Sequence, residues 1–309
     1  MKRIILSILI AYVLLLAACT TPDTTQIASL TTTATSTIQP TATTILSPTD
    51  APQVTFPDPN LEVAIRGALN KPEGSIYIWE LEGLTSLAAA AADTGYIPPP
   101  ESYKITDLTG LEYCINLTTL HLKWNWEISD LSSLASLTKL TDLSLSANKV
   151  SDLTPIGSLT NLTRLRLYFN QISDISPLAS LTKLTVLGLG KNQISDISPL
   201  AGLTNLEILN LYSNNISDIS PLAGLNKLTL LYLYTNQISD ISTLASLTSL
   251  TNLEISRNQI SDIEPLLSLT KLRKLELWDN PLDDASVNVY LPELKERGVE
   301  IVTPGFWEF

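Results

Sequence analysis

Few side chains in this 309-residue sequence are of the types that perform covalent or acid–base chemistry. There is one histidine, His121, and there are two cysteines, Cys19 and Cys114, far apart in the chain. Nucleophilic and metal sites need clusters of such residues at defined spacings, and no glycine-rich phosphate-binding signature is present. The sequence therefore predicts no catalytic residues, no metal ligands and no cofactor, so we do not expect an enzyme.

A row of aspartates offers a different chemistry, which is calcium binding by carboxylate oxygens. The aspartates follow serines and recur at a constant interval, as Asp130, Asp152, Asp174, Asp196, Asp218, Asp240 and Asp262. Stacked carboxylates repel one another, and calcium would relieve that repulsion. Each aspartate also stands between a bend and a helical turn, where it can accept backbone hydrogen bonds in water. We favour hydrogen bonding over calcium.

Asparagines recur at the same interval, except that their first step is one position longer than the later ones. A side-chain amide has both donors and acceptors for backbone groups, whereas an aspartate would bury a charge. We therefore expect a structural ladder that bonds the backbone of adjoining turns. Its members are Asn125, Asn148, Asn170, Asn192, Asn214, Asn236, Asn258 and Asn280.

The repeat that positions these residues is typified by residues 184–205, LTVLGLGKNQISDISPLAGLTN. Alternation in Leu187-Gly188-Leu189 predicts a short strand with leucines inward. Ser198-Pro199-Leu200 predicts a helical turn that the Ser198 hydroxyl caps. A lone 22-residue coil buries too little apolar surface to fold, but stacked coils cover each other. The prediction is a solenoid of the α/β class, with a concave parallel sheet and short 3-10 or helical turns on the convex face.

The pattern LxxLxLxxN at this period is typical of leucine-rich repeats. Repeats that follow NQISDISPLxxLTxLTxL resemble the 22-residue internalin-type leucine-rich repeats of bacterial surface proteins, and they cover most of the chain. The resemblance implies a binding or adhesion module without catalytic activity. We expect it to act as a monomer.

Residues 1–55 have the composition of a targeting and linker region. In residues 1–18, Lys2-Arg3 and an apolar run predict an export signal. The sequence Leu16-Ala17-Ala18-Cys19 is similar to the lipobox of bacterial lipoproteins, which implies lipidation of Cys19; the alternative is an ordinary signal with a chance cysteine. Residues 19–55, rich in threonine, serine and proline, predict a disordered tether. We expect an exported lipoprotein, membrane-anchored at the bacterial cell surface.

Two caps should close the ends of the repeat array, which we place at residues 84–282. In the N-terminal cap, residues 56–83, Asp58 should cap a helix whose apolar residues at helical spacing cover the first coil. We expect the first strand at Leu84–Leu87. The C-terminal cap and tail, residues 283–309, should form a helix and a strand, with Pro292 at a kink or at the helix end.

Two irregularities interrupt the repeats near the N-terminal end of the array. Residues 89–103 are an insertion, and a single extra residue falls near Glu127 in the next coil. Because adjacent coils lie about 5 Å apart, the two should touch. Whether the insertion binds something or is only tolerated stays open. Cys114 occupies a leucine position, so we expect a buried free thiol and no disulfide.

The outward strand positions vary far more than the core. Aromatic side chains with a polar tip are enriched at binding hot spots. Candidate ligand-binding residues on the concave face are His121, Trp124, Trp126, Arg164, Arg166, Tyr168, Tyr212, Tyr232, Tyr234, Glu254, Glu276 and Trp278. They favour a cell-surface module that binds a protein or a glycan over a passive scaffold or spacer of the cell envelope. A net charge of −12 disfavours a nucleic-acid partner.

Overall fold

The computed structural model describes residues 52–89 and 104–302. The predicted export signal, the lipidation site Cys19 and the tether up to residue 51 lie outside the described residues, as do residues 90–103 of the insertion and the tail from residue 303. The predictions for those segments therefore stay predictions.

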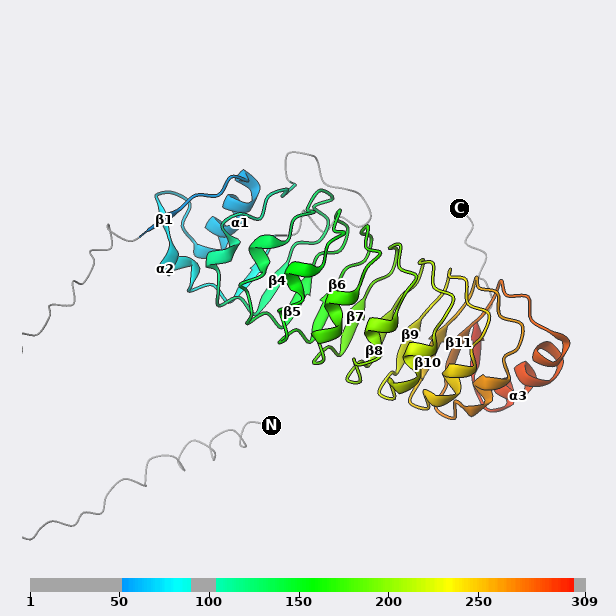
Figure 1. Ribbon diagram of the computed structural model, residues 1–309. Coiled ribbons are helices and arrows are strands. Elements are labelled where there is room, and N and C mark those ends of the chain that lie inside the picture. The colour runs from blue at the N-terminus through cyan, green and yellow to red at the C-terminus, as the bar shows by residue number, and fades with distance from the viewer. Residues whose placement is uncertain (1–51, 90–103, 303–309) are drawn as a thin grey trace, which may run out of the picture. The chain divides into compact units, whose positions relative to one another are not determined.

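Short strands stack in sequence order into one parallel sheet, which has ten strands within the described residues (Figure 1). Neighbouring strands pair in register, so that Leu165, Leu187 and Leu209 lie side by side. This confirms the predicted leucine-rich repeat solenoid. The strands are β3 (Ser86–Ala88), β4 (Thr119–His121), β5 (Asp142–Ser144), β6 (Arg164–Arg166), β7 (Val186–Gly188), β8 (Ile208–Asn210), β9 (Leu230–Tyr232), β10 (Asn252–Glu254), β11 (Lys274–Glu276) and β12 (Glu300–Val302).

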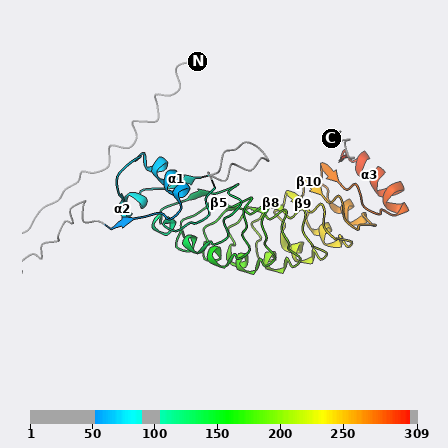
Figure 2. The same ribbon diagram turned by 90° about the horizontal axis from the view of Figure 1, so that it is seen from above.

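Short 3-10 turns lie opposite the strands and make the outer wall. Figure 2 shows the coils following an arc, with the strands on its inner side and the turns on its outer side. The sheet is therefore the concave face. The turns are η3 (Leu111–Tyr113), η4 (Ser132–Leu134), η5 (Thr154–Ile156), η6 (Ser176–Ser180), η7 (Ser198–Leu200), η8 (Ser220–Gly224), η9 (Ser242–Ser246) and η10 (Glu264–Ser268).

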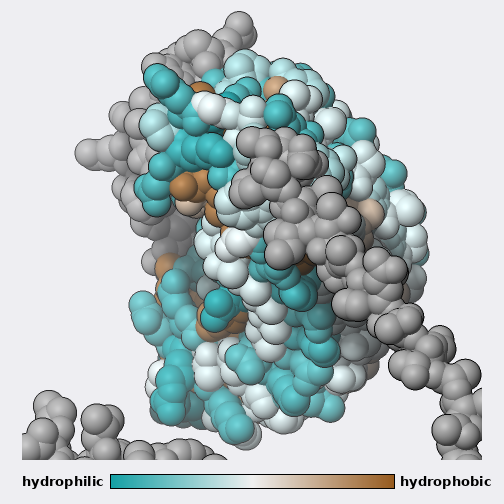
Figure 3. All heavy atoms as spheres, turned by 90° about the vertical axis from the view of Figure 1, so that its left-hand side faces the viewer, coloured by the Kyte–Doolittle hydropathy of each residue, from teal (hydrophilic) through white to brown (hydrophobic). Residues whose placement is uncertain are grey.

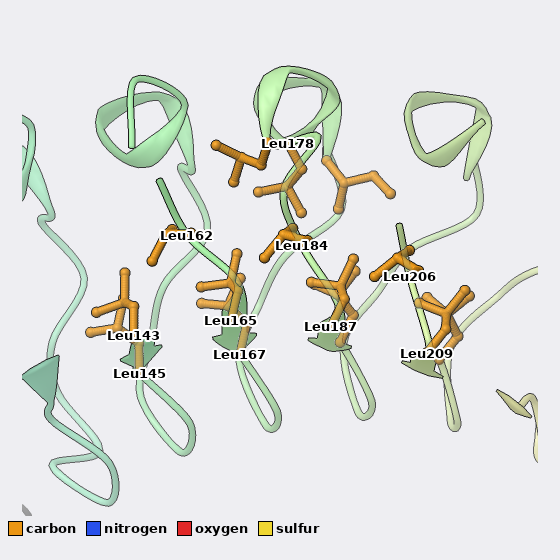
Figure 4. Close-up of a cluster of buried hydrophobic side chains, with 14 of the residues drawn as sticks. Leu143, Leu145, Leu162, Leu165, Leu167, Leu178, Leu184, Leu187, Leu206 and Leu209 are labelled. Atoms are coloured by element: carbon orange, nitrogen blue, oxygen red, sulfur yellow. The ribbon is translucent and has the colours of Figure 1, made fainter. Parts of the chain in front are cut away.

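The core consists of columns of leucine and isoleucine between the two walls (Figure 4). Each column holds the same repeat position from successive coils, as with Leu143, Leu165, Leu187 and Leu209, all 0 % exposed. Cys114 is likewise 0 % exposed, and burial raises the pKa of its thiol to about 12. It is a free thiol that packs as a small apolar residue, as expected.

Each of the seven outer turns η4–η10 is capped by the preceding aspartate, and the prediction that the Ser198 hydroxyl caps the turn is wrong. Asp196 Oδ1 accepts the N–H of Ser198 at 2.8 Å, so the carboxylate already occupies the capping place. Hydrogen bonds from Ser198 hold the pKa of Asp196 below its usual value. The expectation that the seven aspartates accept backbone hydrogen bonds is confirmed, because each makes this bond at 2.8 Å.

Each ladder asparagine joins its own coil to the preceding one. Asn192 Nδ2 donates to the carbonyls of Leu167 and Leu189 at 3.0 and 2.9 Å, and its Oδ1 accepts the N–H of Ile172 at 3.1 Å. The residue before each ladder asparagine, such as Lys191, is not glycine and has a left-handed φ between 51 and 68°. The amide bonds hold this strained bend in place.

The coil with the extra residue contacts the first residue of the insertion and the segment that follows it. Asn125 Nδ2 donates to the carbonyl of Ala89 at 3.2 Å, and Asn125 Oδ1 accepts the N–H of Ile105 at 2.9 Å. One coil later the ladder is incomplete, since Asn148 Oδ1 has no hydrogen-bond partner among the described residues. The expected contact between the two irregularities therefore exists at Ala89, the residue of the insertion that the structure describes.

The N-terminal cap consists of β1 (Gln53–Val54), α1 (Pro59–Leu69), β2 (Ile76–Tyr77) and α2 (Ile78–Leu81). Asp58 caps α1 as predicted and accepts the N–H groups of Asn60 and Leu61. The first strand, β3, begins two residues later than expected, because the N–H of Leu84 still bonds the preceding turn. Figure 3 views this end of the molecule, where the hydrophobic residues in view form small, separate patches. The cap covers the end of the core.

The C-terminal cap contains a π-helical turn, η11 (Ser286–Tyr290), followed by α3 (Leu291–Glu296) and β12. Pro292 lies at the second residue of α3, directly after the π-helical turn, so the alternative that it marks the end of the helix is wrong. The missing N–H of a proline is tolerated in a first helical turn. Ser286 Oγ accepts the N–H of Ile263 and donates to the carbonyl of Ser261, which serves the backbone of the last repeat.

Candidate functional site

The concave wall presents three rows of outward side chains, because they alternate with the buried leucines of each strand. The first row is Thr119, Asp142, Arg164, Val186, Ile208, Leu230, Asn252 and Lys274. The second row is His121, Ser144, Arg166, Gly188, Asn210, Tyr232, Glu254 and Glu276. The third row, two residues beyond, is Lys123, Ser146, Tyr168, Gly190, Tyr212, Tyr234, Ser256 and Trp278.

Three tyrosines of the third row stack along the solenoid. The rings of Tyr212 and Tyr234 have centroids 4.7 Å apart and planes inclined by 12°. The ring centroids of Tyr168 and Tyr212 are 6.2 Å apart, although a whole coil separates their strands. Stacked aromatic pairs of this kind stabilise each other by about 0.5–1.5 kcal/mol beyond their burial. The stack is a rigid feature of the wall.

Two glycines in the coil between make this stack possible. A Cβ at Gly188 would stand 2.2 Å from Tyr168 Cζ, and one at Gly190 would stand 2.2 Å from Tyr212 Cε1. Both rings therefore lean over the same coil, where a side chain would collide with them. Burial there raises the pKa of the Tyr168 hydroxyl. The pattern of outward residues alone did not show this use of the glycines.

Beside the stack, the first row has three half-buried apolar residues, Val186, Ile208 and Leu230. Tyr232 stands next to them in the second row, and burial followed by the charge of Glu254 raises the pKa of its hydroxyl. We call the set of Val186, Ile208, Leu230, Tyr168, Tyr212, Tyr232 and Tyr234 the central surface. It combines apolar area with phenolic hydroxyls over strands β6–β9.

On the N-terminal side of the central surface, basic side chains gather around Asp142. Its Oδ1 accepts from Arg166 Nη1 at 2.9 Å, and its Oδ2 lies 3.7 Å from Arg164 Nη1. His121 Nε2 is 3.3 Å from the same carboxylate. Asp142 was not among the predicted residues, although counting one repeat period back from Arg164 places it in the same row. We call this group with Lys123 the basic end.

On the C-terminal side, carboxylates predominate. Glu254 and Glu276 pair in register on β10 and β11, and Lys274 Nζ lies 2.6 Å from Glu276 Oε1 and 4.0 Å from Glu254 Oε1. Burial and the neighbouring charge of Glu276 raise the pKa of Glu254. Hydrogen bonding to Glu276 raises the pKa of Lys274. With Glu300 of β12, these residues form what we call the acidic end.

The predicted tryptophans lie apart from the central surface. Trp124 and Trp126 lie at a bend, with ring centroids 5.6 Å apart. The centroids of the Trp124 and Phe169 rings are 6.4 Å apart. Lys191 Nζ lies 4.8 Å from the centroid of the Phe169 ring, so this ring packs against the following coil. Trp278 borders the acidic end, where the Arg257 guanidinium lies 4.6 Å from its ring.

The structure thus brings together the predicted residues Tyr168, Tyr212, Tyr232 and Tyr234, and places the predicted charged residues at two ends. In the part of the chain that the structure describes, no group of three or more His, Cys, Asp or Glu side chains could hold a metal ion. No helix among residues 52–89 and 104–302 is long and apolar enough to cross a membrane. Ring stacking, steric contacts and charge are the features that define the candidate site.

Comparisons with known proteins agree with this architecture. A family model described as Leucine Rich repeats (2 copies) matches residues 160–202, 204–246 and 248–289, and one described as Leucine Rich repeat matches residues 113–131. A search of curated proteins found no match.

Two solved structures from Listeria monocytogenes are similar over most of their length. Internalin C2 is 42% identical, with 72% of this chain and 94% of that chain covered and a TM-score of 0.66. An internalin (inlF) is 34% identical, with 80% and 91% covered and a TM-score of 0.59. The leucine-rich repeat ectodomain of the Arabidopsis thaliana receptor kinase GASSHO1/SCHENGEN3 is 24% identical, with 72% and 27% covered and a TM-score of 0.58, a likeness that shows the fold.

Proposed function

This chain belongs to the internalin-type family of bacterial leucine-rich repeat proteins, and from that membership we propose that it binds another protein on the concave wall of its solenoid. Leucine-rich repeat arrays present extended concave surfaces that suit protein ligands. We further propose that the chain is exported, works as a monomer at the cell surface, and is held to the membrane by a lipid on Cys19.

The observation that carries the proposal is the central surface. Its aromatic and aliphatic side chains are half-buried rather than covered, and rigid aromatic side chains with polar tips are the groups enriched at binding hot spots. The tyrosines lean over Gly188 and Gly190, positions where any larger residue would displace them. A passive spacer would need neither the stack nor the two glycines, since its core and ladders already hold the coils together.

Charge supports a protein partner over a polyanion. The chain has 31 acidic residues against 19 basic ones, for a net charge of −12. A negative protein repels the phosphate backbone of nucleic acids and anionic lipid headgroups. The concave wall nevertheless holds both signs of charge at its two ends, which favours a partner that itself carries both.

The test is capture of protein partners by the purified full-length chain, compared with the double variant Tyr212→Ala/Tyr234→Ala. The variant removes the stacked pair that is 4.7 Å apart. We expect it to weaken binding of each specific partner at least about tenfold, or about 1.4 kcal/mol, while the melting temperature changes by only a few degrees.

The matched control is Lys183→Ala/Lys227→Ala. These lysines bond Asn161 and Asn205 at 2.7 Å in exposed positions outside the three concave rows. The control should bind as the wild type does. Equal binding by the tyrosine variant and the wild type would contradict the proposal, and capture of a glycan in place of any protein would replace it.

A further inference from the structure

The concave wall is electrically dipolar along the solenoid. Its basic end has three permanently basic side chains, Lys123, Arg164 and Arg166, against the single carboxylate of Asp142. Its acidic end has three carboxylates, Glu254, Glu276 and Glu300, against the single ammonium of Lys274. Strands β7–β9 hold no charged residue in any of the three rows between these ends.

The ion pairs within each end leave charge available to a partner. Arg164 is 56% exposed as a side chain and its contact with Asp142 is 3.7 Å long, so one carboxylate does not satisfy both arginines. A guanidinium has five donors, and the Asp142 carboxylate cannot use those of two guanidinium groups. At the other end, Lys274 bonds Glu276 at 2.6 Å but stays 4.0 Å from Glu254.

The separation of the basic and acidic ends sets the length of a ligand segment that reaches both. Strands β6 and β10 are four steps apart in the sheet, or about 19 Å at about 4.8 Å per step. An extended chain covers that distance in about six residues at roughly 3.3 Å each, whereas a helix needs about thirteen at 1.5 Å each.

The middle of the wall fits an extended chain better than a helix. The apolar residues Val186, Ile208 and Leu230 run beside a row that includes the polar side chains of Asn210 and Tyr232. An extended segment offers alternating side chains to the apolar row and unsatisfied backbone groups to the polar row. A helix satisfies its own backbone groups and would leave the polar row unused.

We propose that the concave wall takes an extended protein segment in which an acidic and a basic residue stand about six residues apart, with the acidic residue at Arg164 and Arg166 and the basic residue at Glu254 and Glu276. This inference rests on the proposed function and specifies the ligand of that same wall. Charge order along the segment then decides which sequences bind, and the central surface provides contact area between the two charges.

The experiment selects displayed peptides on the full-length chain. In one library a Glu and a Lys are fixed at every spacing from adjacent to about ten residues, with random uncharged residues elsewhere; two matched libraries fix Lys–Lys or Glu–Glu pairs. The wild type should enrich the Glu–Lys library with a maximum near a spacing of about six, at least about tenfold over the matched libraries.

Charge reversal at either end provides two independent variants whose folding is checked by their melting temperatures. Arg164→Glu/Arg166→Glu makes both ends acidic and should switch the preference to Lys–Lys peptides. Glu254→Lys/Glu276→Lys makes both ends basic and should switch it to Glu–Glu peptides. Both switches together support the proposal, because a nonspecific apolar surface would not follow the charges.

Two outcomes overturn the inference. Enrichment of peptides without regard to their charges or spacing contradicts the dipolar site. If Tyr212→Ala/Tyr234→Ala abolishes that enrichment, the peptides still bind on the concave wall, and only the proposed charge order is wrong. Enrichment from none of the libraries contradicts an extended-segment ligand, while the capture of folded partners still decides the proposed function separately.

Discussion

Gly190 shows how one residue shapes the candidate site. Its φ lies outside the left-handed range, so its backbone does not require glycine, and the reason for a glycine is space. A Cβ there would stand 2.2 Å from Tyr212 Cε1 and 2.3 Å from Cδ1. The residue therefore matters through the ring that occupies the place of its missing side chain.

We predict that Gly190→Ala destabilises the protein by about 1–3 kcal/mol, because the added methyl forces the Tyr212 ring out of its stack. In a Tyr212→Ala background the same substitution should cost almost nothing, so that the two changes couple in a double-mutant cycle measured by urea unfolding. Gly202→Ala is the control, since nothing lies within 4 Å of a Cβ there. Additive effects of the two substitutions would show that the ring does not lie over this glycine.

Glu254 provides a pH test at the acidic end. Burial and the charge of Glu276 raise its pKa above the ordinary value of 4.5, so the native state binds this proton more tightly than the unfolded state does. This group therefore makes the free energy of unfolding fall as pH rises from about 4.5 through its native pKa.

We predict that Glu254→Gln is more stable than the wild type at pH about 7, and that the difference disappears below pH about 4.5. Thermal melting across this range measures it. Glu276→Gln is the contrast, because it loses the 2.6 Å bond to Lys274 and should gain no stability at neutral pH. A difference for Glu254→Gln that stays constant with pH would contradict the assignment.

At the scale of elements, the periodicity of the sequence predicted the features that every coil shares, but it could not predict contacts between particular side chains of different coils. The strand, the outer turn and the asparagine recur once in every coil, so a single coil was enough to place them all. Asp142 was missed because its importance depends on the arginines one coil later, and the Tyr168–Tyr212 contact depends on two glycines in the coil between them. The capping role of Asp196 was assigned to Ser198 because both residue types favour helix starts.

The N-terminal cap depends on one carboxylate. Asp58 is 5% exposed, and while its Oδ1 caps helix α1, its Oδ2 accepts the N–H groups of Thr106 and Asp107 in the first coil after the insertion. These hydrogen bonds outweigh the effect of burial and hold its pKa below the ordinary value. The same side chain thus starts the helix and fastens it to the array.

We predict that Asp58→Ala costs about 3 kcal/mol or more, because it leaves several buried N–H groups without partners. Asp196→Ala, which removes only exposed hydrogen bonds from Ser198, should cost about 1 kcal/mol or less. Hydrogen exchange should show the first variant opening at the N-terminal end while β8–β11 stay protected. A similar loss of stability for both variants would mean that Asp58 does not connect the cap to the array.

At the scale of the whole molecule, the stacked coils hold the central surface between two charged ends at fixed intervals. The solenoid is a property of the whole family, whereas the proposed ligand follows from the particular outward residues in the three rows of this chain. The proposed export signal and the proposed lipid on Cys19, both within residues 1–51, would decide where this surface works.

For attachment, we predict that the mature chain incorporates a fatty-acid analogue and partitions into a detergent phase, because a diacylated cysteine gives lasting membrane anchorage. Cys19→Ala should abolish the label and release or misprocess the protein, whereas Cys114→Ala should keep it, since that thiol is buried. Labelling that persists in the Cys19 variant would rule out the proposed anchor.

The most direct test of the account is where a captured partner touches the solenoid. A photoreactive amino acid is placed at Ile208, in the first row of the concave wall, or at Lys183, outside the three rows, in the otherwise unchanged full-length chain. Binding on the concave wall predicts a cross-link to the partner from Ile208 and none from Lys183. A cross-link from Lys183 with none from Ile208 would contradict binding on the concave wall.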